Sequence, residues 1–305
     1  MKSKKLIVVV GPTAIGKTKL AISLAQHFKT QVLSSDSRQF FKEMRIGTAV
    51  PSEEELAAAH HHFIQHISIH KSYSVGDFEK EALRVLEKIH VTNDYAILVG
   101  GSGLYTDAVV HGLDEFPEVP GEIREELNTI LQNQGIERLQ RELFETDPIY
   151  YQKVDVMNPH RIIRALEIIR ATGKPFSSFL KKDHTLRPFD VVYLGITAER
   201  EIIYNRINVR VDEMMKNGLL EEAQSLYPYR NLNALQTVGY KELFRFLDGK
   251  ITFDFAVSEI KKNTRRFAKR QLTWLRKNPN ILWVEYTADT KEIIPRIHSK
   301  LQNLE

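Results

Sequence analysis

The first residues whose types and spacing suit chemistry on phosphates form the segment GPTAIGKT, in which two glycines separated by four residues precede a lysine and a threonine. Glycines at both ends let the backbone curl so that successive amides point inward, Lys17 neutralises phosphate oxygens, and Thr18 can ligate Mg²⁺. The alternative, a tight turn with a chance lysine, is disfavoured because a strand pattern precedes the segment and a helix pattern follows it. The sequence therefore predicts a phosphate loop made of Gly11, Pro12, Thr13, Ala14, Ile15, Gly16, Lys17 and Thr18.

Asp36 is the acidic residue best placed to work beside this loop. It ends the predicted strand 31–35, and the carboxyl ends of parallel strands share one rim of a sheet. A carboxylate there can be a general base or a support for a metal ion. The alternative is a turn or helix cap formed with Ser35 and Ser37.

An acid is missing where a nucleotide-hydrolysing enzyme needs one. Such an enzyme should have an apolar strand that ends in a metal-supporting aspartate. Here the apolar strand Tyr95 to Val99 ends in Gly100-Gly101-Ser102, and Asp94 lies on the wrong side of that strand. The phosphate loop can therefore hold a pyrophosphate on a carrier other than a nucleotide.

A basic segment near the C-terminus, Lys261 to Lys277, contains eight lysines and arginines and no acid. At helical spacing one face carries Lys262, Arg266 and Lys269, while another set turns toward the core, namely Ile260, Phe267, Leu272 and Leu275. A solvated helix face is the alternative. The absence of acids and the nearby Gln271 and Trp274 favour contact with a phosphate backbone.

Four histidines, His60, His61, His62 and His66, raise the question of a metal site. Three adjacent histidines cannot all face one ion on a helix, and no cysteine or carboxylate is spaced to complete a tetrahedral set. We expect packing or contact with RNA at these positions.

The elements that position these residues alternate between strand and helix in the N-terminal part. Continuous or β-branched runs predict strands, and apolar spacing of three and four predicts helices. The predicted order is strand 6–10, helix 19–28, strand 31–35, helix 75–89 and strand 95–99. We expect an α/β fold with a doubly wound parallel sheet, a phosphate-binding loop and a helical insertion.

The insertion begins at a proline-rich break, Phe116 to Gly121, after which the pattern is helical to about Pro188. Strand patterns return at 191–196 and again at 281–286. We therefore expect residues 1–114 and 190–305 to form the α/β core with the basic helices, and residues 115–189 to form a helical domain.

The composition restricts the class of protein. A chain of 305 residues with 42% apolar content can bury a sizeable core, and it contains no cysteine, which excludes disulfides, thiolate metal sites and cysteine nucleophiles. The formal charge of +4 is mild, so a surface for a polyanion must come from local clusters. The apolar run Leu6 to Val10 is too short for a signal peptide or a membrane span. We expect a soluble cytoplasmic protein.

Many segments together resemble the bacterial tRNA dimethylallyltransferase family, in family order and over nearly the full chain. Ser102 stands where the family often has threonine, which keeps the hydroxyl, and Val50 stands where a lysine is common, which puts a phosphate role there in doubt. The matching segments are GPTAIGKT at Gly11, SSDSRQF at Ser34, IGTAVP at Ile46, DF at Asp77, LVGGSGLY at Leu98, NPHRIIRALE at Asn158, TGKP at Thr172, RVDEMMKNGLLEEA at Arg210, TVGYKE at Thr237 and AKRQLTWLRK at Ala268.

The resemblance implies transfer of a dimethylallyl group from dimethylallyl pyrophosphate to the exocyclic N6 amine of the adenosine 3′-adjacent to the anticodon of a tRNA. The phosphate loop would then hold the isoprenoid pyrophosphate with Mg²⁺ as cofactor on Thr18, and Arg210 would clamp the leaving group. Asp36, Lys17 and Ser102 would be the catalytic residues, with Asp36 as the base.

The resemblance also implies an RNA surface and a helical insertion that embraces the anticodon stem. For His160, Arg161 and Arg164 the alternative is that the arginines pair with Glu167 or other acids of the insertion. The residues assigned to RNA by the resemblance and the basic segment are Asp36, Ser37, Arg38, Gln39, Ser102, Arg124, His160, Arg161, Ile162, Ile163, Arg164, Arg266, Lys269 and Arg270.

Three other functions stay open on the sequence: a kinase of a nucleoside or small metabolite, a prenyltransferase acting on free adenylate, and a non-catalytic RNA-binding switch. The helical insertion and the basic segment disfavour the second. The partners expected under the favoured hypothesis are tRNA and dimethylallyl pyrophosphate, with no membrane, and the protein is expected to be a monomer.

Overall fold

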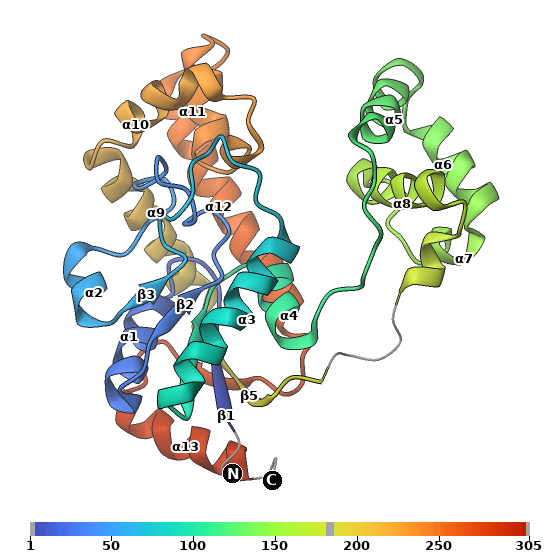
Figure 1. The fold of residues 1–305 in the computed structure, drawn as a ribbon. Coiled ribbons are helices and arrows are strands. Elements are labelled where there is room, and N and C mark those ends of the chain that lie inside the picture. The colour runs from blue at the N-terminus through green and yellow to red at the C-terminus, as the bar shows by residue number, and fades with distance from the viewer. Residues whose placement is uncertain (1–3, 181–185, 303–305) are drawn as a thin grey trace. The chain divides into compact units, whose positions relative to one another are not determined.

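The computed structural model describes residues 4–180 and 186–302, which divide into two compact units (Figure 1). The first, called the core unit, comprises Met1–His111 and Leu186–Glu305, and the second, called the helical unit, comprises Gly112–Thr185. The helical unit thus begins three residues before the expected 115 and ends four before the expected 189. Each unit has an apolar core of its own.

The core unit contains a sheet of six parallel strands in the order β3-β2-β4-β1-β5-β6. The expected doubly wound α/β class is confirmed, and five of the strands lie where the sequence predicts them. The remaining strand, β3, was not predicted. It lies at His61–His62 in the histidine segment, which is therefore extended there. The strands are β1 Lys4–Val10, β2 Val32–Ser34, β3 His61–His62, β4 Tyr95–Val99, β5 Phe189–Thr197 and β6 Leu282–Glu285.

Strand β1 lies in the middle of the sheet and shows why its sequence is apolar throughout. Leu6 and Val8 pack on one face, and Ile7 and Val9 pack on the other. Alternate side chains of a strand point to opposite faces, so a strand covered on both sides needs apolar residues at every position.

Helices cover both faces of this sheet (Figure 1). In the core unit they are α1 Lys17–Phe28, α2 Glu53–Ala58, α3 Val75–Thr92, α4 Gly103–His111, α9 Arg200–Lys216, α10 Leu219–Leu226, α11 Tyr240–Leu247, α12 Phe253–Leu275 and α13 Thr290–Gln302, with 3₁₀ turns at Tyr227–Tyr229 and Asn233–Leu235. None of the helices that the structure describes is long and apolar enough to cross a membrane.

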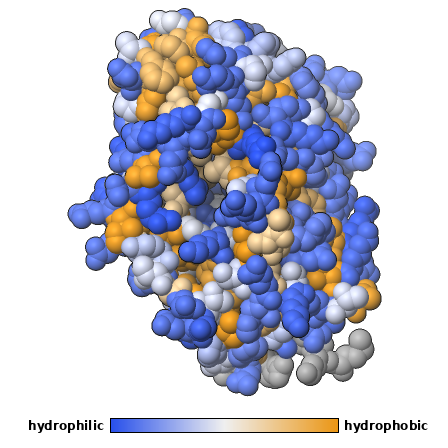
Figure 2. All heavy atoms as spheres, turned by 90° about the vertical axis from the view of Figure 1, so that its left-hand side faces the viewer, coloured by the Kyte–Doolittle hydropathy of each residue, from blue (hydrophilic) through white to orange (hydrophobic). Residues whose placement is uncertain are grey.

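The carboxyl ends of β2, β4 and β1 meet at one edge of the sheet. Ser34 is paired with Val99, and Val99 in turn with Val9. The phosphate loop after β1, Asp36 after β2 and Gly101 after β4 are therefore brought to the same edge, as the parallel strand order requires. On the side of α2, α9 and α10 the surface is mostly hydrophilic and is hollowed near its middle (Figure 2).

The helical unit consists of α5 Gly121–Gln134, α6 Ile136–Thr146, α7 Pro148–Tyr151, α8 Pro159–Thr172 and a 3₁₀ turn at Phe176–Phe179. Two sequence predictions need correction here. Ile162 and Ile163 on α8 are 0% and 2% exposed in the core of this unit, so their side chains cannot contact RNA. The helical period that exposes His160 and Arg161 turns the next two residues inward.

For Arg164, an ion pair within the helical unit matches the alternative that was left open for Arg161 and Arg164, and Arg124 joins the same acid. The carboxylate of Glu167, a buried residue of α8, forms ion pairs with the guanidinium groups of Arg124 at 3.1 Å and Arg164 at 3.3 Å. Two cations around one buried carboxylate satisfy a charge that would otherwise be costly to bury. Arg124 and Arg164 therefore have a structural role, and any contact with RNA uses their remaining exposed donors.

Candidate active site

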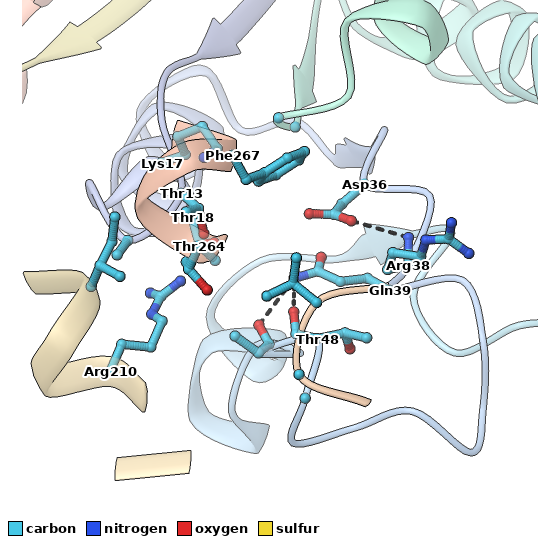
Figure 3. Close-up of a pocket in the computed structure, with 18 of the residues that line it drawn as sticks. Thr13, Lys17, Thr18, Asp36, Arg38, Gln39, Thr48, Arg210, Thr264 and Phe267 are labelled. Atoms are coloured by element: carbon cyan, nitrogen blue, oxygen red, sulfur yellow. Dashed lines mark hydrogen bonds between the residues drawn. The ribbon is translucent and has the colours of Figure 1, made fainter. Parts of the chain in front are cut away.

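A cavity of about 540 Å³ lies at the carboxyl edge of the sheet in the core unit. Its walls come from the phosphate loop, the turn after β2, the loop after β4, and helices α9 and α12 (Figure 3). Residues 47–49 and 237–239 also line it, so the structure brings together segments that are far apart in the chain. The sequence-predicted residues that line it are Thr13, Ala14, Gly16, Lys17, Thr18, Asp36, Ser37, Arg38, Gln39, Ser102 and Arg210.

The backbone of the phosphate loop explains its glycines. Gly16 has a φ of 106° and begins α1 in the left-handed region, which glycine adopts without strain. A Cβ at Gly11 would lie 2.9 Å from the carbonyl oxygen of Ile196 on the neighbouring strand β5. The first glycine therefore permits close approach of two backbones, and the second starts the helix whose N-terminus favours an anion.

The ammonium group of Lys17 lies at this helix N-terminus, where it donates to the carbonyl oxygen of Pro12 at 2.8 Å. Burial lowers the pKa of Lys17 to about 8; Asp36 opposes this shift, and Arg210 adds to it. A buried cation between a carboxylate and a guanidinium is a strong attractor for an anion, because an anion would restore the charge balance.

Two arginines of α9 add positive charge to the cavity. Arg206 and Arg210 are one helical turn apart, and the side chain of Arg210 extends from α9 toward the side of the cavity that holds Thr18 (Figure 3). Arg206 donates to the carbonyl oxygen of Ala14 at 2.8 Å. Burial and then Arg206 lower the pKa of Arg210. Sequence reasoning identified Arg210 but missed Arg206, although their spacing of four on a helix was a signal.

Asp36 lies across the cavity from this cationic group. Its Oδ1 accepts the backbone N–H of Arg38 at 3.1 Å, and its carboxylate faces the interior of the cavity (Figure 3). A turn is therefore present, as in the alternative, although the Asp36 side chain bonds to the backbone of Arg38 and the Ser35 hydroxyl bonds to Val99 and Thr106. The turn holds the carboxylate in place while Oδ2 faces the cavity. The two interpretations of Asp36 are compatible.

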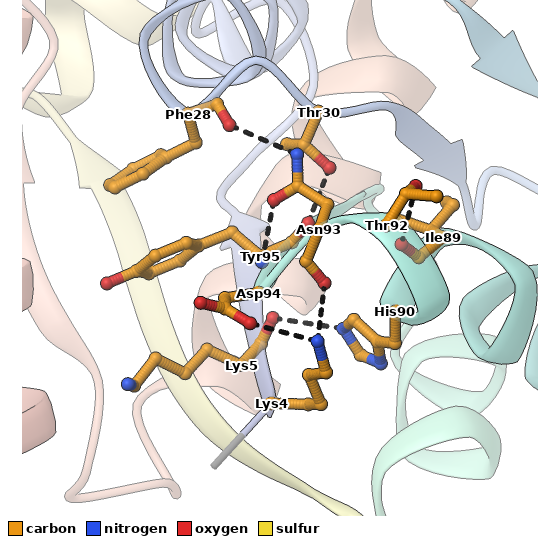
Figure 4. A network of polar contacts seen from close by, with 10 residues as sticks. All are labelled: Lys4, Lys5, Phe28, Thr30, Ile89, His90, Thr92, Asn93, Asp94 and Tyr95. Carbon is orange, nitrogen blue, oxygen red and sulfur yellow. Dashed lines mark hydrogen bonds and ion pairs between the residues drawn. The ribbon is translucent and has the colours of Figure 1, made fainter. Parts of the chain in front are cut away.

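Asp94 lies at the opposite edge of the sheet, as its place before β4 indicates. It accepts the ammonium of Lys4 at 2.9 Å, while Asn93 accepts the N–H of Tyr95 at 3.0 Å and donates to the carbonyl of Phe28 (Figure 4). Asn93 also donates to the carbonyl of Lys29. This network joins the beginnings of β1 and β4. It cannot serve a ligand at the phosphate loop.

Two polar residues after Asp36 have their side chains committed to the protein. Arg38 donates to the carbonyls of Asn233 and Ala234 at 3.0 and 2.9 Å, and burial lowers its pKa. Gln39 donates to the carbonyls of Thr48 and Ala49 at 3.2 and 3.0 Å. Both shape the wall of the cavity; their contact with RNA stays a prediction.

The wall formed by residues 45–49 is held by a residue that sequence reasoning missed. One carboxylate oxygen of Glu222 accepts the backbone N–H groups of Arg45 and Ile46. The other accepts the backbone N–H of Gly47 and the hydroxyl of Tyr240, and all four distances are 2.6–2.9 Å. Gly47 is required because a Cβ there would lie 2.6 Å from the Tyr240 ring. Because both oxygens of Glu222 accept hydrogen bonds, a glutamine at this position would place its NH₂ group against two of these donors.

We expect Glu222→Gln to lower the free energy of unfolding by about 2 kcal/mol and kcat several-fold, because a glutamine presents an NH₂ to groups that also donate. Thermal or urea unfolding and single-turnover kinetics measure the two effects. Glu221→Gln is the matched control, since Glu221 is the exposed neighbour on the same helix. Equal stability of both variants would contradict the role of Glu222.

Helix α12 contains most of the basic segment, which begins with two lysines in ion pairs and ends with exposed cations. Lys261 pairs with Asp212 at 2.6 Å and Lys262 with Glu259 at 2.7 Å, so acids outside the segment neutralise its beginning.

Phe267 does not turn into the core as predicted: it is 41% exposed and lines the cavity. A shallow groove at the helix end is lined by Lys269, Arg270, Thr273, Trp274 and Lys277.

Gln271 does not face solvent, contrary to its predicted association with a phosphate backbone. It is 8% exposed, and both ends of its amide bond to backbone groups of the cavity wall. Its helical position, three residues before Trp274, places it on the face that packs against the loop after β4.

The donor set of the cavity matches the preferences of a hard cation. Among residues 4–180 and 186–302 there is no group of three histidine, cysteine or acidic side chains that could hold a metal ion. The cavity offers the Thr18 hydroxyl and the Asp36 carboxylate. Mg²⁺ commonly uses one or two protein oxygens together with substrate phosphates and water, so these residues fit that ion.

Comparison with known proteins identifies the relatives of this chain. Residues 39–278 match the family model described as IPP transferase. The chain is 60% identical to the tRNA dimethylallyltransferase of Christiangramia forsetii, over 98% of this chain and 99% of that protein, and 56% identical to that of Flavobacterium johnsoniae, over 98% and 99%.

Solved structures agree in fold. The full-length tRNA isopentenylpyrophosphate transferase of Bacillus halodurans superposes with a TM-score of 0.72 at 38% identity, over 98% of this chain and 96% of that chain. A eukaryotic dimethylallyltransferase acting on tRNA superposes with a TM-score of 0.82 at 28% identity, over 99% of this chain and 80% of that chain.

Proposed function

The chain belongs to the tRNA dimethylallyltransferase family, and on this premise we propose that its cavity transfers the dimethylallyl group of dimethylallyl pyrophosphate to the N6 amine of the adenosine 3′-adjacent to the anticodon in tRNA. The observation that supports this most directly is that one cavity has the cations Lys17 and Arg210 on one side and the carboxylate of Asp36 on the other. A cationic side suits a departing pyrophosphate, and an acidic side suits an amine that loses a proton.

The reaction breaks the bond between the isoprenoid C1 and the pyrophosphate oxygen, and forms a bond between C1 and N6. Negative charge grows on the leaving pyrophosphate, where the amides of the phosphate loop, Lys17 and Arg210 stabilise it. The amine is a weak nucleophile because its lone pair is delocalised into the ring, so Asp36 accepts its hydrogen bond and then its proton. Ser102 lines the same cavity and contributes a hydroxyl beside the acceptor.

We propose Mg²⁺ as the cofactor, held by the Thr18 hydroxyl together with pyrophosphate oxygens. When bound, it neutralises charge on the pyrophosphate. Thr13, Lys17 and Arg210 orient the same group whether or not the ion is present.

For tRNA we propose two surfaces, each on one unit. In the core unit the exposed cationic end of α12, with Lys269 and Arg270, contacts the phosphate backbone. In the helical unit, exposed His160 and Arg161 on α8 do so. We also propose that the enzyme works as a monomer in the cytoplasm, where its RNA substrate occurs.

Incubation with labelled dimethylallyl pyrophosphate and unmodified tRNA, followed by mass spectrometry of the RNA, tests the proposal. We expect a gain of one dimethylallyl group on the adenosine next to the anticodon. ATP consumption without label in RNA would instead indicate a kinase. Label in free adenylate but not in RNA would indicate an adenylate prenyltransferase, and RNA affinity without turnover an RNA-binding switch.

Arg270→Ala should weaken binding of an anticodon stem-loop about three- to tenfold and reduce the slope of log affinity against log salt by about 1, because one cation that meets phosphate is lost. Filter binding between low and moderate salt measures both. Lys261→Ala is the matched control, since Asp212 already neutralises Lys261. An unchanged slope for Arg270→Ala would exclude Arg270 from the RNA surface.

A further inference from the structure

We propose that Gln271 is a positioning residue of the transfer reaction, which ties the phosphate loop to the loop after β4 and so fixes the separation of Lys17 from Ser102. Its Oε1 accepts the backbone N–H of Thr13 at 2.9 Å, and its Nε2 donates to the carbonyl oxygen of Gly101 at 2.8 Å. This inference rests on the proposed function and adds a residue to its machinery.

The two partners determine which way the amide faces. The N–H of Thr13 can only donate and the carbonyl of Gly101 can only accept, so the oxygen of Gln271 faces the phosphate loop and its nitrogen faces Gly101. A glutamate at this position keeps the first bond and places an oxygen against the carbonyl of Gly101. A methionine of the same length keeps the volume and makes neither bond.

The Gln271 amide packs closely against the loop after β4. A Cβ at Gly101 would lie 2.2 Å from Nε2 of Gln271 and 3.7 Å from Nζ of Lys17, so these two side chains converge over the bare face of Gly101. One turn further along α12, the Trp274 ring comes within 2.5 Å of a Cβ built at Gly103. Two glycines thus let α12 approach the loop that carries Ser102.

A brace is needed at this point because the sheet no longer connects the two loops. The ladder between β1 and β4 ends with Val9 and Val99, followed by a bond from the N–H of Gly100 to the carbonyl of Val9. Beyond it, Gln271 bridges Thr13 and Gly101 from outside the sheet. Because a misplacement of about 1 Å can cost on the order of 10²-fold in rate, a connection that holds the two walls together affects catalysis directly.

The test compares Gln271→Met and Gln271→Glu with Ser258→Ala, an exposed substitution on the same helix. We expect Gln271→Met to lower kcat about tenfold per folded molecule and to weaken binding of inorganic pyrophosphate several-fold. Affinity for an anticodon stem-loop should stay within about twofold of the parent. Calorimetry with pyrophosphate, measured well below the unfolding transition, separates this from a general loss of structure.

Gln271→Glu adds a readout that a merely structural residue would not change. It retains an acceptor for the N–H of Thr13, and it adds a negative charge at the proposed pyrophosphate site. Pyrophosphate affinity should therefore be lower in Gln271→Glu than in Gln271→Met, whereas affinity for an anticodon stem-loop should be the same in both variants. The two variants thus differ in the charge that they place at the site as well as in the hydrogen bonds that they lose.

Three outcomes would overturn the role of Gln271. They are a parental kcat per folded molecule in Gln271→Met, a parental affinity for pyrophosphate in that variant, or an equal loss in Ser258→Ala. If the parent binds pyrophosphate but transfers nothing to RNA, the proposed function fails while the pyrophosphate measurements still decide the role of Gln271.

Discussion

Asp36→Ala is expected to lower kcat for transfer to tRNA by about 10³-fold, with less than about a threefold change in affinity for an anticodon stem-loop. The reason is that the N6 amine becomes a competent nucleophile only as its proton is accepted, and the carboxylate of Asp36 faces the cavity where that amine must lie. Single-turnover transfer and filter binding measure the two quantities separately.

Asp36→Asn separates the role of the base from that of the turn. Asparagine retains an oxygen that can accept the N–H of Arg38, as Oδ1 of Asp36 does at 3.1 Å, and it cannot take a proton. We expect it to be nearly as inactive as the alanine variant. Asp94→Asn, at the far edge of the sheet, should retain transfer. Parental turnover by Asp36→Asn would show that another group accepts the proton.

Lys17→Met should lower kcat/KM for the isoprenoid donor by about 10²- to 10³-fold, the usual cost of removing one group that stabilises a developing anion in a buried site. Steady-state kinetics with the donor varied at saturating RNA measures this loss. RNA affinity alone serves as the internal control, because Lys17 is buried within the cavity.

The same lysine predicts the pH dependence of the donor site. The pKa of Lys17 is lowered to about 8, so its cation is present below that pH and is lost as the pH rises through it. Affinity for inorganic pyrophosphate should therefore fall above about pH 8 in the parent. Lys17→Arg keeps its charge throughout this range and should flatten the dependence. A fall of equal steepness in Lys17→Arg would assign it to a different group.

The local features of the site were predictable because their information lies in neighbouring residues. A β-branched run, a glycine-bounded loop and a helical pattern follow one another in the first 28 residues, and each is decided by local sterics and backbone hydrogen bonding. Asp36 was predictable for a related reason, since parallel strands present their carboxyl ends at one edge.

Predictions from the sequence were least accurate for side chains whose partner could be either a ligand or a residue far away in the chain. Arg124 and Arg164 were assigned to RNA and lie on buried Glu167, and Ile162 and Ile163 belong to the core of the helical unit. The basic segment suggested one continuous cationic face, but the acids that neutralise its beginning include Asp212 on another helix.

By itself, then, the sequence determined the phosphate loop, the positions of five of the six strands and the side of the sheet on which Asp36 must lie. Only the tertiary structure decided how the cavity walls are held, through Glu222 on residues 45–47 and Gln271 between Thr13 and Gly101. Local structure follows from contacts within a few residues. These braces join backbone groups more than 150 residues away in the chain, where no spacing rule connects the partners.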